Sequence, residues 1–298
     1  MSVKFKQYNE ERGFTGDFEN VRRFLLRINE TEMVEVNFLW ARWEWMHSLT
    51  RYMGEGVIPK IGLWMDDDKI VALATCEISL GAGFFVTDPS YEYLKEDMLS
   101  YGMKTHHKDG TFKALISNSD REFQKIAISH GMVPCQDSEH TAVLDITDDI
   151  SYQLPEGFSV HSLADGFDEY SLSNCKYRGF GNGEKMPQSD FIASHEDYTG
   201  PNLNKDIHLY IKAADGGYAA HCGSWYDEET DYAYIEPVCA DPDYRKLGCA
   251  KAVVLEAIKR CGQLGAKKAF VISSQQFYYN IGFYPHSNHT WWSIELEK

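Results

Sequence analysis

Apolar and polar positions follow the same order in the two halves of the chain. Residues 61–75, IGLWMDDDKIVALAT, contain two apolar stretches separated by an acidic turn. Residues 207–222, IHLYIKAADGGYAAHC, repeat this pattern about 146 positions later. Two apolar stretches around a turn that is rich in Asp and Gly are typical of a β-hairpin. Both segments are therefore predicted to be hairpins.

Two further pairs of segments indicate an internal repeat. Residues 88–103 (DPSYEYLKEDMLSYGM) correspond to 241–258 (DPDYRKLGCAKAVVLEAI), at an offset of 153. Residues 127–134 (AISHGMVP) correspond to 278–285 (YYNIGFYP), at an offset of 151. Three matches in one order and at nearly one offset predict two tandem copies of one fold.

The boundary between the copies is predicted within residues 145–157, a polar stretch that ends in Pro-Glu-Gly. This gives domains at 1–150 and 151–298. The second copy shows an α/β pattern in the order β-α-α-β-β-β-α-β-α-β-β. Its strands are expected at 158–163, 207–213, 217–225, 231–240, 267–273, 283–285 and 290–296, and its helices at 167–178, 188–195, 247–264 and 275–281.

Two local features stand out in these elements. Pro237 interrupts the strand at 231–240 and removes a ladder donor, so we expect a β-bulge or an edge there. In the first copy, helices are expected at 18–28 and around the aromatic-rich stretch 37–49. We expect the aromatic residues of that stretch to fill a core or a domain interface rather than to stack on a ligand: Phe38, Trp40, Trp43 and Trp45. His106 and His107 have no metal-ligand spacing and are predicted to lie in a solvated loop.

Composition narrows the possible functions. The net charge is −16, with −9 in the first 150 residues and −7 in the rest. An acidic surface of this kind repels nucleic acid and anionic membranes and suits cationic small molecules. The seven scattered cysteines contain no CxxC pair, which predicts reduced cytoplasmic thiols and neither a disulfide framework nor a metal site. No apolar run is long enough for a membrane span, and the first residues have no apolar signal-peptide core.

The start of the helix at 247–264 carries the main chemical signal. The stretch RKLGCA at 245–250 combines basic residues with Gly248 and Ala250, which keep little bulk near the backbone. The first N–H groups of a helix are exposed and lie at the positive end of its dipole. This combination predicts a phosphate or pyrophosphate cradle. The alternative is a tight turn before an ordinary amphipathic helix.

These residues resemble a known family. RKLGCA at 245–250 is similar to the R/Q-x-x-G-x-G/A pyrophosphate loop of the GNAT acyltransferase superfamily, and FYYNIGF at 277–283 resembles its FYxxxGF segment. The resemblance covers residues 156–298. It implies two tandem GNAT-like folds, each with a mixed, mostly antiparallel central sheet flanked by helices. It also implies acetyl-CoA as co-substrate, with these contacts: Val238, Cys239, Ala240, Arg245, Lys246, Leu247, Gly248, Cys249, Ala250 and Lys251.

By the same resemblance, an amine attacks the thioester directly in a ternary complex. Glu236, in an otherwise apolar strand, is the candidate base, with His221 as the competitor and a structural carboxylate as the alternative. Tyr278 holds the position of the family's acid tyrosine, and Tyr279 is its alternative. The family often has Asn just before this segment, where the present chain has Ser273, Ser274 and Gln275, so that contact is in doubt. Cys249 is more simply a small residue than a nucleophile.

The expected reaction is the acetylation of a small amine, and the charge of the chain favours a cationic one. The alternatives are another acyl donor, a peptide or aminoglycoside acceptor, or a non-catalytic coenzyme A-binding module. A homodimer is compatible with the sequence. The loop at 285–289 is expected between the last two strands, where family members contact the acceptor.

The first copy lacks the cradle residues. Glu92, Lys95 and Asp97 stand at the positions of Arg245, Gly248 and Ala250. Two carboxylates repel a pyrophosphate, so we expect no coenzyme A binding in this half. Since this copy still has the pattern of a turn followed by a helix, we expect ligand access, rather than folding, to require the glycine at 248.

Overall fold

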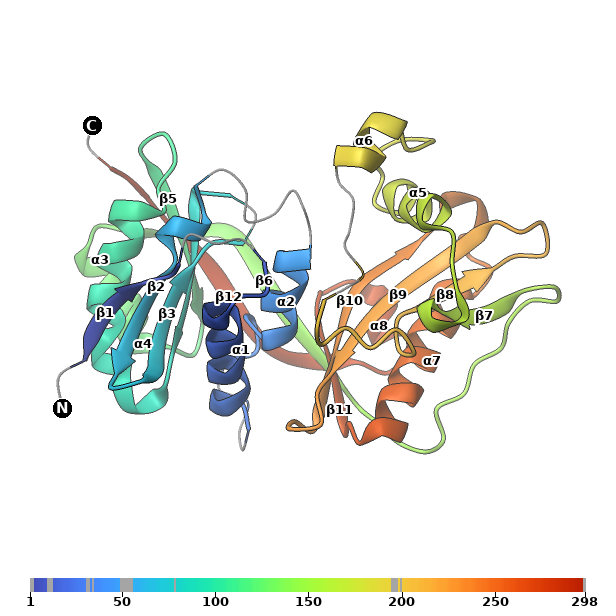
Figure 1. Cartoon of the computed structure of the whole chain (residues 1–298), viewed down its shortest axis with the longest axis horizontal. Coiled ribbons are helices and arrows are strands. Elements are labelled where there is room, and N and C mark those ends of the chain that lie inside the picture. Colours follow the sequence, from blue (N-terminus) through green and yellow to red (C-terminus); the bar gives the residue numbers. More distant parts are fainter. Residues whose placement is uncertain are drawn as a thin grey trace. The chain divides into compact units, whose positions relative to one another are not determined.

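The computed structural model describes residues 3–9, 13–30, 33, 35–48, 56–77, 79–193, 198 and 200–296. Its contacts divide the chain into two compact units (Figure 1). Unit 1 comprises residues 1–141, 196–201 and 286–298, and unit 2 comprises residues 142–195 and 202–285. Among the described residues, no helix combines the length and the apolar character that crossing a bilayer requires.

This division differs from a single cut between residues 150 and 151. The strand β6 (Val133–Asp145) begins in unit 1 and ends in unit 2. The last strand, β12 (Tyr284–Glu295), belongs to unit 1 from His286 onward and pairs antiparallel with β5 (Thr111–Ser117). The prediction that residues 290–296 close the sheet of the second copy is therefore wrong. An apolar strand pattern identifies a strand but does not identify its partner.

The prediction of a loop at 285–289 is wrong for the same reason. These residues continue β12, and His289 pairs with Ser117 of unit 1. They contribute a strand to unit 1 and no acceptor loop to unit 2.

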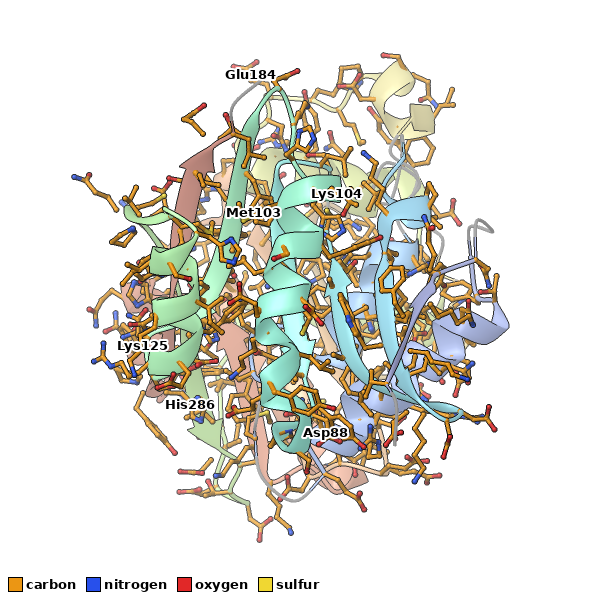
Figure 2. The ribbon with its side chains drawn as sticks, turned by 90° about the vertical axis from the view of Figure 1, so that its left-hand side faces the viewer. Asp88, Met103, Lys104, Lys125, Glu184 and His286 are labelled. Carbon is orange, nitrogen blue, oxygen red and sulfur yellow. The ribbon has the colours of Figure 1, made fainter. Side chains whose placement is uncertain are left out.

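Unit 1 is a mixed sheet with helices packed against it. Its strands follow the order β1-β2-β3-β4-β5-β12-β6. Figure 2 shows α3 and α4 side by side over this sheet. The remaining elements are β1 (Lys4–Gln7), α1 (Gly16–Ile28), α2 (Trp40–Ser48), β2 (Gly62–Asp66), β3 (Lys69–Thr75), β4 (Ala82–Thr87), η2 (Pro89–Leu94), α3 (Lys95–Thr105) and α4 (Arg121–Ser129).

The aromatic-rich stretch of unit 1 forms core, as predicted. Phe38, Trp40 and Trp43 are almost completely buried, and Trp45 is half-buried. The indole Nε1 of Trp43 donates a hydrogen bond to the carbonyl oxygen of Phe18 at 3.1 Å. A buried indole N–H with a backbone partner is the state that a packed core favours.

His106 is a core residue, contrary to the predicted solvated loop. Its side chain is fully buried, and its Nε2 lies 2.7 Å from the carbonyl oxygen of Lys60. Burial lowers the pKa of His106 to about 4. The burial of His106 could not be predicted from residue spacing, because one imidazole that contacts a backbone carbonyl produces no periodic pattern in the sequence.

Unit 1 should therefore lose stability at mildly acid pH. His106 titrates near 6.5 when unfolded and near 4 when folded, so the unfolded state binds more protons between these values. This contribution is fully present above pH 6.5 and is lost towards pH 4, by about 3 kcal/mol at most. In thermal melts between pH 7 and pH 4.5, His106→Gln should show a smaller fall in Tm than the native chain. His107→Gln is the matched control, and equal pH dependence in all three proteins would contradict this account.

Unit 2 follows the predicted element order up to its last strand. Its strands lie in the order β6-β11-β10-β9-β8-β7. The elements are β7 (Ser159–Ser162), α5 (Glu169–Gly179), α6 (Gln188–Ala193), β8 (Leu209–Lys212), β9 (Tyr218–Tyr226), β10 (Tyr232–Ala240), η4 (Pro242–Tyr244), α7 (Cys249–Leu264), β11 (Lys268–Ile272) and α8 (Gln276–Tyr279). The helices α5 and α7 pack against β9, whose residues are buried from Ala219 to Trp225 (Figure 1).

The two units share one strand pattern. In each, antiparallel strands lead to a short parallel pairing, β4 with β5 and β10 with β11. In each, a helix follows the first strand of the parallel pair and another follows the second. The predicted fold class, a mixed and mostly antiparallel sheet flanked by helices in two tandem copies, is confirmed.

Candidate active site

A β-bulge distorts β10 at the predicted proline. Ile235 pairs with Ser224 and Val238 pairs with Cys222, so that Glu236 and Pro237 together oppose the single residue Gly223. The peptide bond between Glu236 and Pro237 is cis. Two residues opposite one are the defining feature of a bulge. The predicted bulge is confirmed.

Gly223 makes this bulge possible, and the sequence reading missed it. A Cβ atom there would overlap the Glu236 carbonyl oxygen and lie 2.7 Å from Pro237 Cδ. Trp225 Nε1 donates to the same carbonyl oxygen at 2.9 Å and holds the bulged backbone. A glycine inside an apolar strand next to a strand that contains proline could have been recognised as a close backbone approach.

Beyond the bulge, β10 separates from β11. The parallel pairing joins Tyr232, Ala233 and Tyr234 to residues 268–270 and extends no further within the described chain. Residues 238–240 pair with β9 on the other side. Their backbone groups on the β11 side are therefore available to an extended polar ligand.

Glu236 lies at the bulge with a fixed carboxylate. Its side chain is half-buried, and the hydroxyl of Tyr234 donates a hydrogen bond to its Oε2 atom. Tyr234 lies two residues earlier on the same strand, so that both side chains point to the same face of the sheet. Sequence reasoning identified Glu236 and missed Tyr234, although the i, i+2 spacing was visible.

Tyr278 lies in α8 and packs among apolar side chains. Its ring contacts Phe277 and Phe283, and only 7% of the residue is exposed. Burial raises the pKa of Tyr278 well above its ordinary value, and the nearby Glu236 and Cys239 raise it further. The phenol is therefore protonated at neutral pH, which is the form that donates a proton.

His221, the competing base, lies in the interior of unit 2. It is 1% exposed, and its Nδ1 atom has no hydrogen-bond partner in the part of the chain that the structure describes. Burial lowers its pKa well below the ordinary value. An imidazole so enclosed is a poor partner for an incoming amine.

The turn between β10 and α7 is open towards solvent. The residues from Arg245 to Gly248 are exposed, and Leu247 is 47% exposed although it is apolar. Gly248 is the N-cap of α7, and no side chain among the described residues caps this helix. The first N–H groups of α7 thus have no intrahelical acceptor and face the turn. The predicted cradle residues are brought together at this helix start.

Gly248 also has a backbone role. Its φ is +87°, a conformation that favours glycine, whereas a Cβ atom there would have only the Gln153 carbonyl oxygen nearby, at 4.0 Å. At the corresponding position of unit 1, Lys95 has φ −55° and begins α3 directly. The inference that folding does not require this glycine is therefore corrected: the two units use different turns.

Arg245 connects the turn to its surroundings. Its Nη2 donates to the Gly179 carbonyl oxygen at 2.8 Å, and its Nε donates to the Ala240 carbonyl oxygen at 3.3 Å. Its guanidinium thus fixes the turn against α5 and the end of β10. Cys249 is buried, and burial raises its pKa, which fits a small packing residue.

A cavity of about 340 Å³ lies beside the start of α7 within unit 2. Lys251 and Leu255 of α7 line one side, and residues 280–282 after α8 line another. Its charged lining groups are the exposed Lys251 ammonium and the carboxylates of Asp145 and Asp149. The cavity offers room for a ligand group next to the cradle.

The corresponding turn of unit 1 is closed by charged side chains. Lys95 Nζ lies 2.9 Å from Glu92 Oε1 and 2.7 Å from Asp120 Oδ2. Burial alone would lower the pKa of Lys95, but the two carboxylates outweigh it and raise this pKa. A charged ammonium with two carboxylates thus stands where unit 2 has an open glycine.

Comparisons with known proteins agree with this geometry. A model of the Acetyltransferase (GNAT) family matches residues 173–285. A comparison with curated proteins found no match. Among solved structures, the GCN5-related N-acetyltransferase from Sphaerobacter thermophilus has a TM-score of 0.62 at 14% identity, over 99% of this chain and 96% of that chain.

Two further solved structures are similar over nearly the whole chain. A tandem GNAT protein from the clavulanic acid biosynthesis pathway has a TM-score of 0.65 at 11% identity, over 100% of this chain and 99% of that chain. Saccharomyces cerevisiae N-myristoyltransferase, solved with bound myristoyl-CoA, has a TM-score of 0.57 at 11% identity, over 99% of this chain and 78% of that chain. At these identities the likeness shows the fold.

Proposed function

We propose that this chain, an acyltransferase of the GNAT superfamily with its family-matched domain at residues 173–285, transfers an acetyl group from acetyl-CoA to a small amine. The observation that carries the proposal is the separation of β10 from β11 beside an uncapped helix start. The separated strand provides backbone hydrogen-bond partners for the amide-rich pantetheine arm of coenzyme A. The helix start provides N–H donors for its pyrophosphate. The chain is proposed to bind coenzyme A once, in unit 2.

The proposed binding contacts follow from these two features. The backbone of Val238, Cys239 and Ala240 would pair with the pantetheine arm. The helix start would hold the pyrophosphate through the residues that the sequence singled out: Arg245, Lys246, Leu247, Gly248, Cys249, Ala250 and Lys251.

The chemistry needs one base and one acid. The neutral amine attacks the thioester carbonyl carbon, the C–S bond breaks, and the proton of the new ammonium passes to Glu236, directly or through water. Tyr278 donates its proton to the departing thiolate and regains one from solvent. The enclosed position of His221 supports Glu236 as the base. The proximity of Tyr278 to Glu236 and Cys239 supports the assignment of both roles near the separated part of β10.

Tyr234 should tune this base. Its hydroxyl donates to Glu236 Oε2 and thereby stabilises the ionised carboxylate. In Tyr234→Phe, the acid limb of the kcat/KM–pH profile should move up by about one pH unit. Tyr232→Phe is the matched control, because Tyr232 lies on the same strand and packs on Phe270 instead. An unmoved acid limb in Tyr234→Phe would contradict this role.

The net charge of −16 supports a small cationic acceptor, and seven free cysteines support a cytoplasmic location. A second candidate is a longer acyl donor, since one structural relative was solved with myristoyl-CoA. Release of thiol from acetyl-CoA and myristoyl-CoA should be measured across a panel of diamines, polyamines, aminoglycosides and peptides. Amine-dependent release from acetyl-CoA supports the proposal, whereas acyl-CoA binding without release for any amine would favour a binding module.

A further inference from the structure

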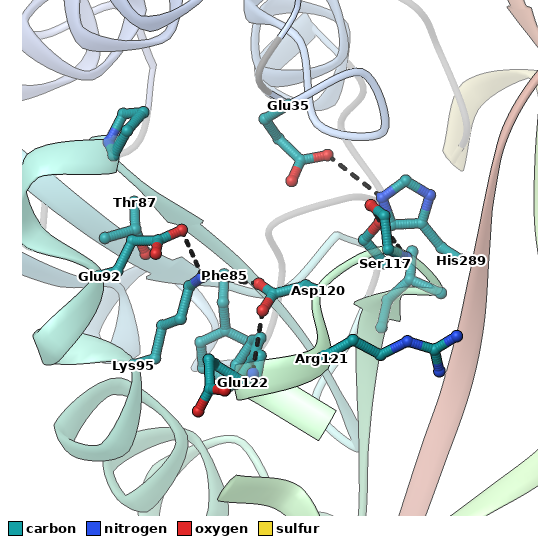
Figure 3. A pocket seen from close by; sticks show the side chains of 14 residues that line it. Glu35, Phe85, Thr87, Glu92, Lys95, Ser117, Asp120, Arg121, Glu122 and His289 are labelled. Carbon is teal, nitrogen blue, oxygen red and sulfur yellow. Dashed lines mark hydrogen bonds and ion pairs between the residues drawn. The ribbon is translucent and has the colours of Figure 1, made fainter. Parts of the chain in front are cut away.

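Unit 1 contains a cavity of about 460 Å³ of its own. It lies between the ends of β4 and β5, the segment η2 and the start of α4, and Figure 3 shows the side chains that line it. Every lining residue belongs to unit 1. A volume of this size accommodates a small molecule.

This cavity is the counterpart of the separated strands in unit 2. The parallel pairing of β4 with β5 joins Ala82 to Lys113 and Gly83 to Ala114 and extends no further in the described chain. Beyond it, the two strands diverge, and Phe85 and Thr87 face the cavity from one side while Leu115 faces it from the other. The fold has therefore kept an opening at the position where unit 2 is proposed to bind its acyl donor.

The chemistry of the opening is different. Its ionisable lining consists of four carboxylates, two basic side chains and one imidazole: Glu35, Glu92, Asp120, Glu122, Lys95, Arg121 and His289. The formal charge is negative when the imidazole is neutral. Asp120 and Glu92 already neutralise the Lys95 ammonium, so it attracts anions poorly. A negatively lined cavity favours a cation and repels a phosphate.

Glu35 and His289 lie next to each other in the lining of this cavity. Glu35 Oε1 accepts a hydrogen bond from the Asn37 backbone N–H at 2.8 Å and lies 3.6 Å from His289 Nε2. His289 is 5% exposed, and its Nδ1 atom has no hydrogen-bond partner among the described residues. Figure 3 shows both side chains on one side of the cavity, opposite Lys95 and Asp120.

A buried imidazole nitrogen without a hydrogen-bond partner is costly unless a ligand satisfies it, and the half-buried Glu35 carboxylate lies beside this imidazole. An ammonium group has three donors and can bond a carboxylate and a hydroxyl together. Ser117, beside His289 in the paired strand, has such a hydroxyl at the cavity wall; it accepts the Ser119 N–H and keeps a second lone pair when it donates to Ser119 Oγ. Phe85, Leu115 and Phe123 supply apolar surface for a short hydrocarbon chain.

We propose that the unit 1 cavity binds a small aliphatic amine in its ammonium form, with the ammonium group on Glu35 and the hydrocarbon part on the apolar wall. This site is separate from the acyl-transfer site proposed for unit 2. In this proposal, unit 2 binds a phosphate group and unit 1 binds a cation, although both units have the same fold.

The test is a calorimetric titration of the full chain with putrescine, without acetyl-CoA. 1,4-Butanediol serves as the uncharged analogue and succinate as the anionic one. The chain should carry Glu236→Gln, so that failure of the acyltransferase proposal leaves this result unaffected. Putrescine should bind at least about tenfold more tightly than either analogue, since only it offers charged donors.

Variants locate the site. Glu35→Gln keeps the oxygen that accepts the Asn37 N–H, so the fold should survive, and putrescine affinity should fall at least about tenfold. Asp68→Asn, in the exposed turn of the β2–β3 hairpin, is the matched control and should change nothing. Ser117→Lys places an ammonium at the wall and should abolish binding. Unchanged affinity in Glu35→Gln, or equal binding of butanediol, would overturn the proposal.

Discussion

Replacement of Gly248 by glutamate should abolish the binding of acetyl-CoA. The new carboxylate would stand at the start of α7, where the N–H groups are proposed to hold a pyrophosphate, and it would repel that group. We expect affinity to fall at least about 30-fold, or roughly 2 kcal/mol, in a calorimetric titration.

Two variants separate this effect from backbone strain. Gly166 has φ +88°, ψ 146° and open space around it, so Gly166→Glu carries a conformational cost at least as large outside the cradle. It should bind acetyl-CoA normally. Gly248→Ala adds one methyl group and should lower stability by about 1–2 kcal/mol while weakening binding by less than about tenfold. If Gly166→Glu and Gly248→Glu weaken acetyl-CoA binding equally, the start of α7 is not the pyrophosphate site.

Glu236→Gln should stop turnover while leaving acetyl-CoA bound. The amide keeps the size of the side chain but cannot take the ammonium proton, so kcat should fall by roughly 10²–10⁴-fold. The dissociation constant of acetyl-CoA should stay within about twofold, because the proposed contacts lie at residues 238–240 and on the helix start. Steady-state kinetics and calorimetry on the same preparation measure both quantities.

Matched variants decide which groups act. Glu228→Gln removes a carboxylate from the exposed turn between β9 and β10 and should leave kcat unchanged. Tyr278→Phe should lower kcat, because the departing thiolate loses its proton donor. Tyr279→Phe should leave kcat unchanged. Full activity in Glu236→Gln would exclude this carboxylate as the base, and loss of activity only in Tyr279→Phe would reassign the acid.

Locally encoded features could be predicted from the sequence. The helix α7 follows from apolar residues on one face and from Gly265, whose φ of +124° ends it. The bulge follows from Pro237, because proline cannot donate to the ladder. Glu236 could be identified because it is a charged residue in an otherwise apolar strand. The turn at 245–250 could be identified because it has a glycine at the start of a helix.

Features that depend on tertiary partners could not be predicted. The strand β12 pairs with β5 of unit 1, more than 150 residues away in sequence, and nothing in its own pattern specifies that partner. His106 is buried by its surroundings, and Tyr234 matters because its hydroxyl reaches Glu236. The cavity of unit 1 exists because β4 and β5 diverge, which no single segment encodes.

The repeat shows how two copies of one fold acquire different chemistry. At the same position after the same kind of strand, unit 2 has a left-handed glycine and an open helix start, and unit 1 has Lys95 between two carboxylates. The substitutions alter the turn itself as well as its charge. We therefore expect an acyl donor in unit 2 and none in unit 1.

A crystal structure of the chain grown with coenzyme A would show where the acyl donor binds. We expect one coenzyme A per chain, with its pyrophosphate on the N–H groups of residues 247–251 and its pantetheine arm along residues 238–240. Coenzyme A in the unit 1 cavity beside Lys95, or no density at the start of α7 at saturating ligand, would contradict this expectation.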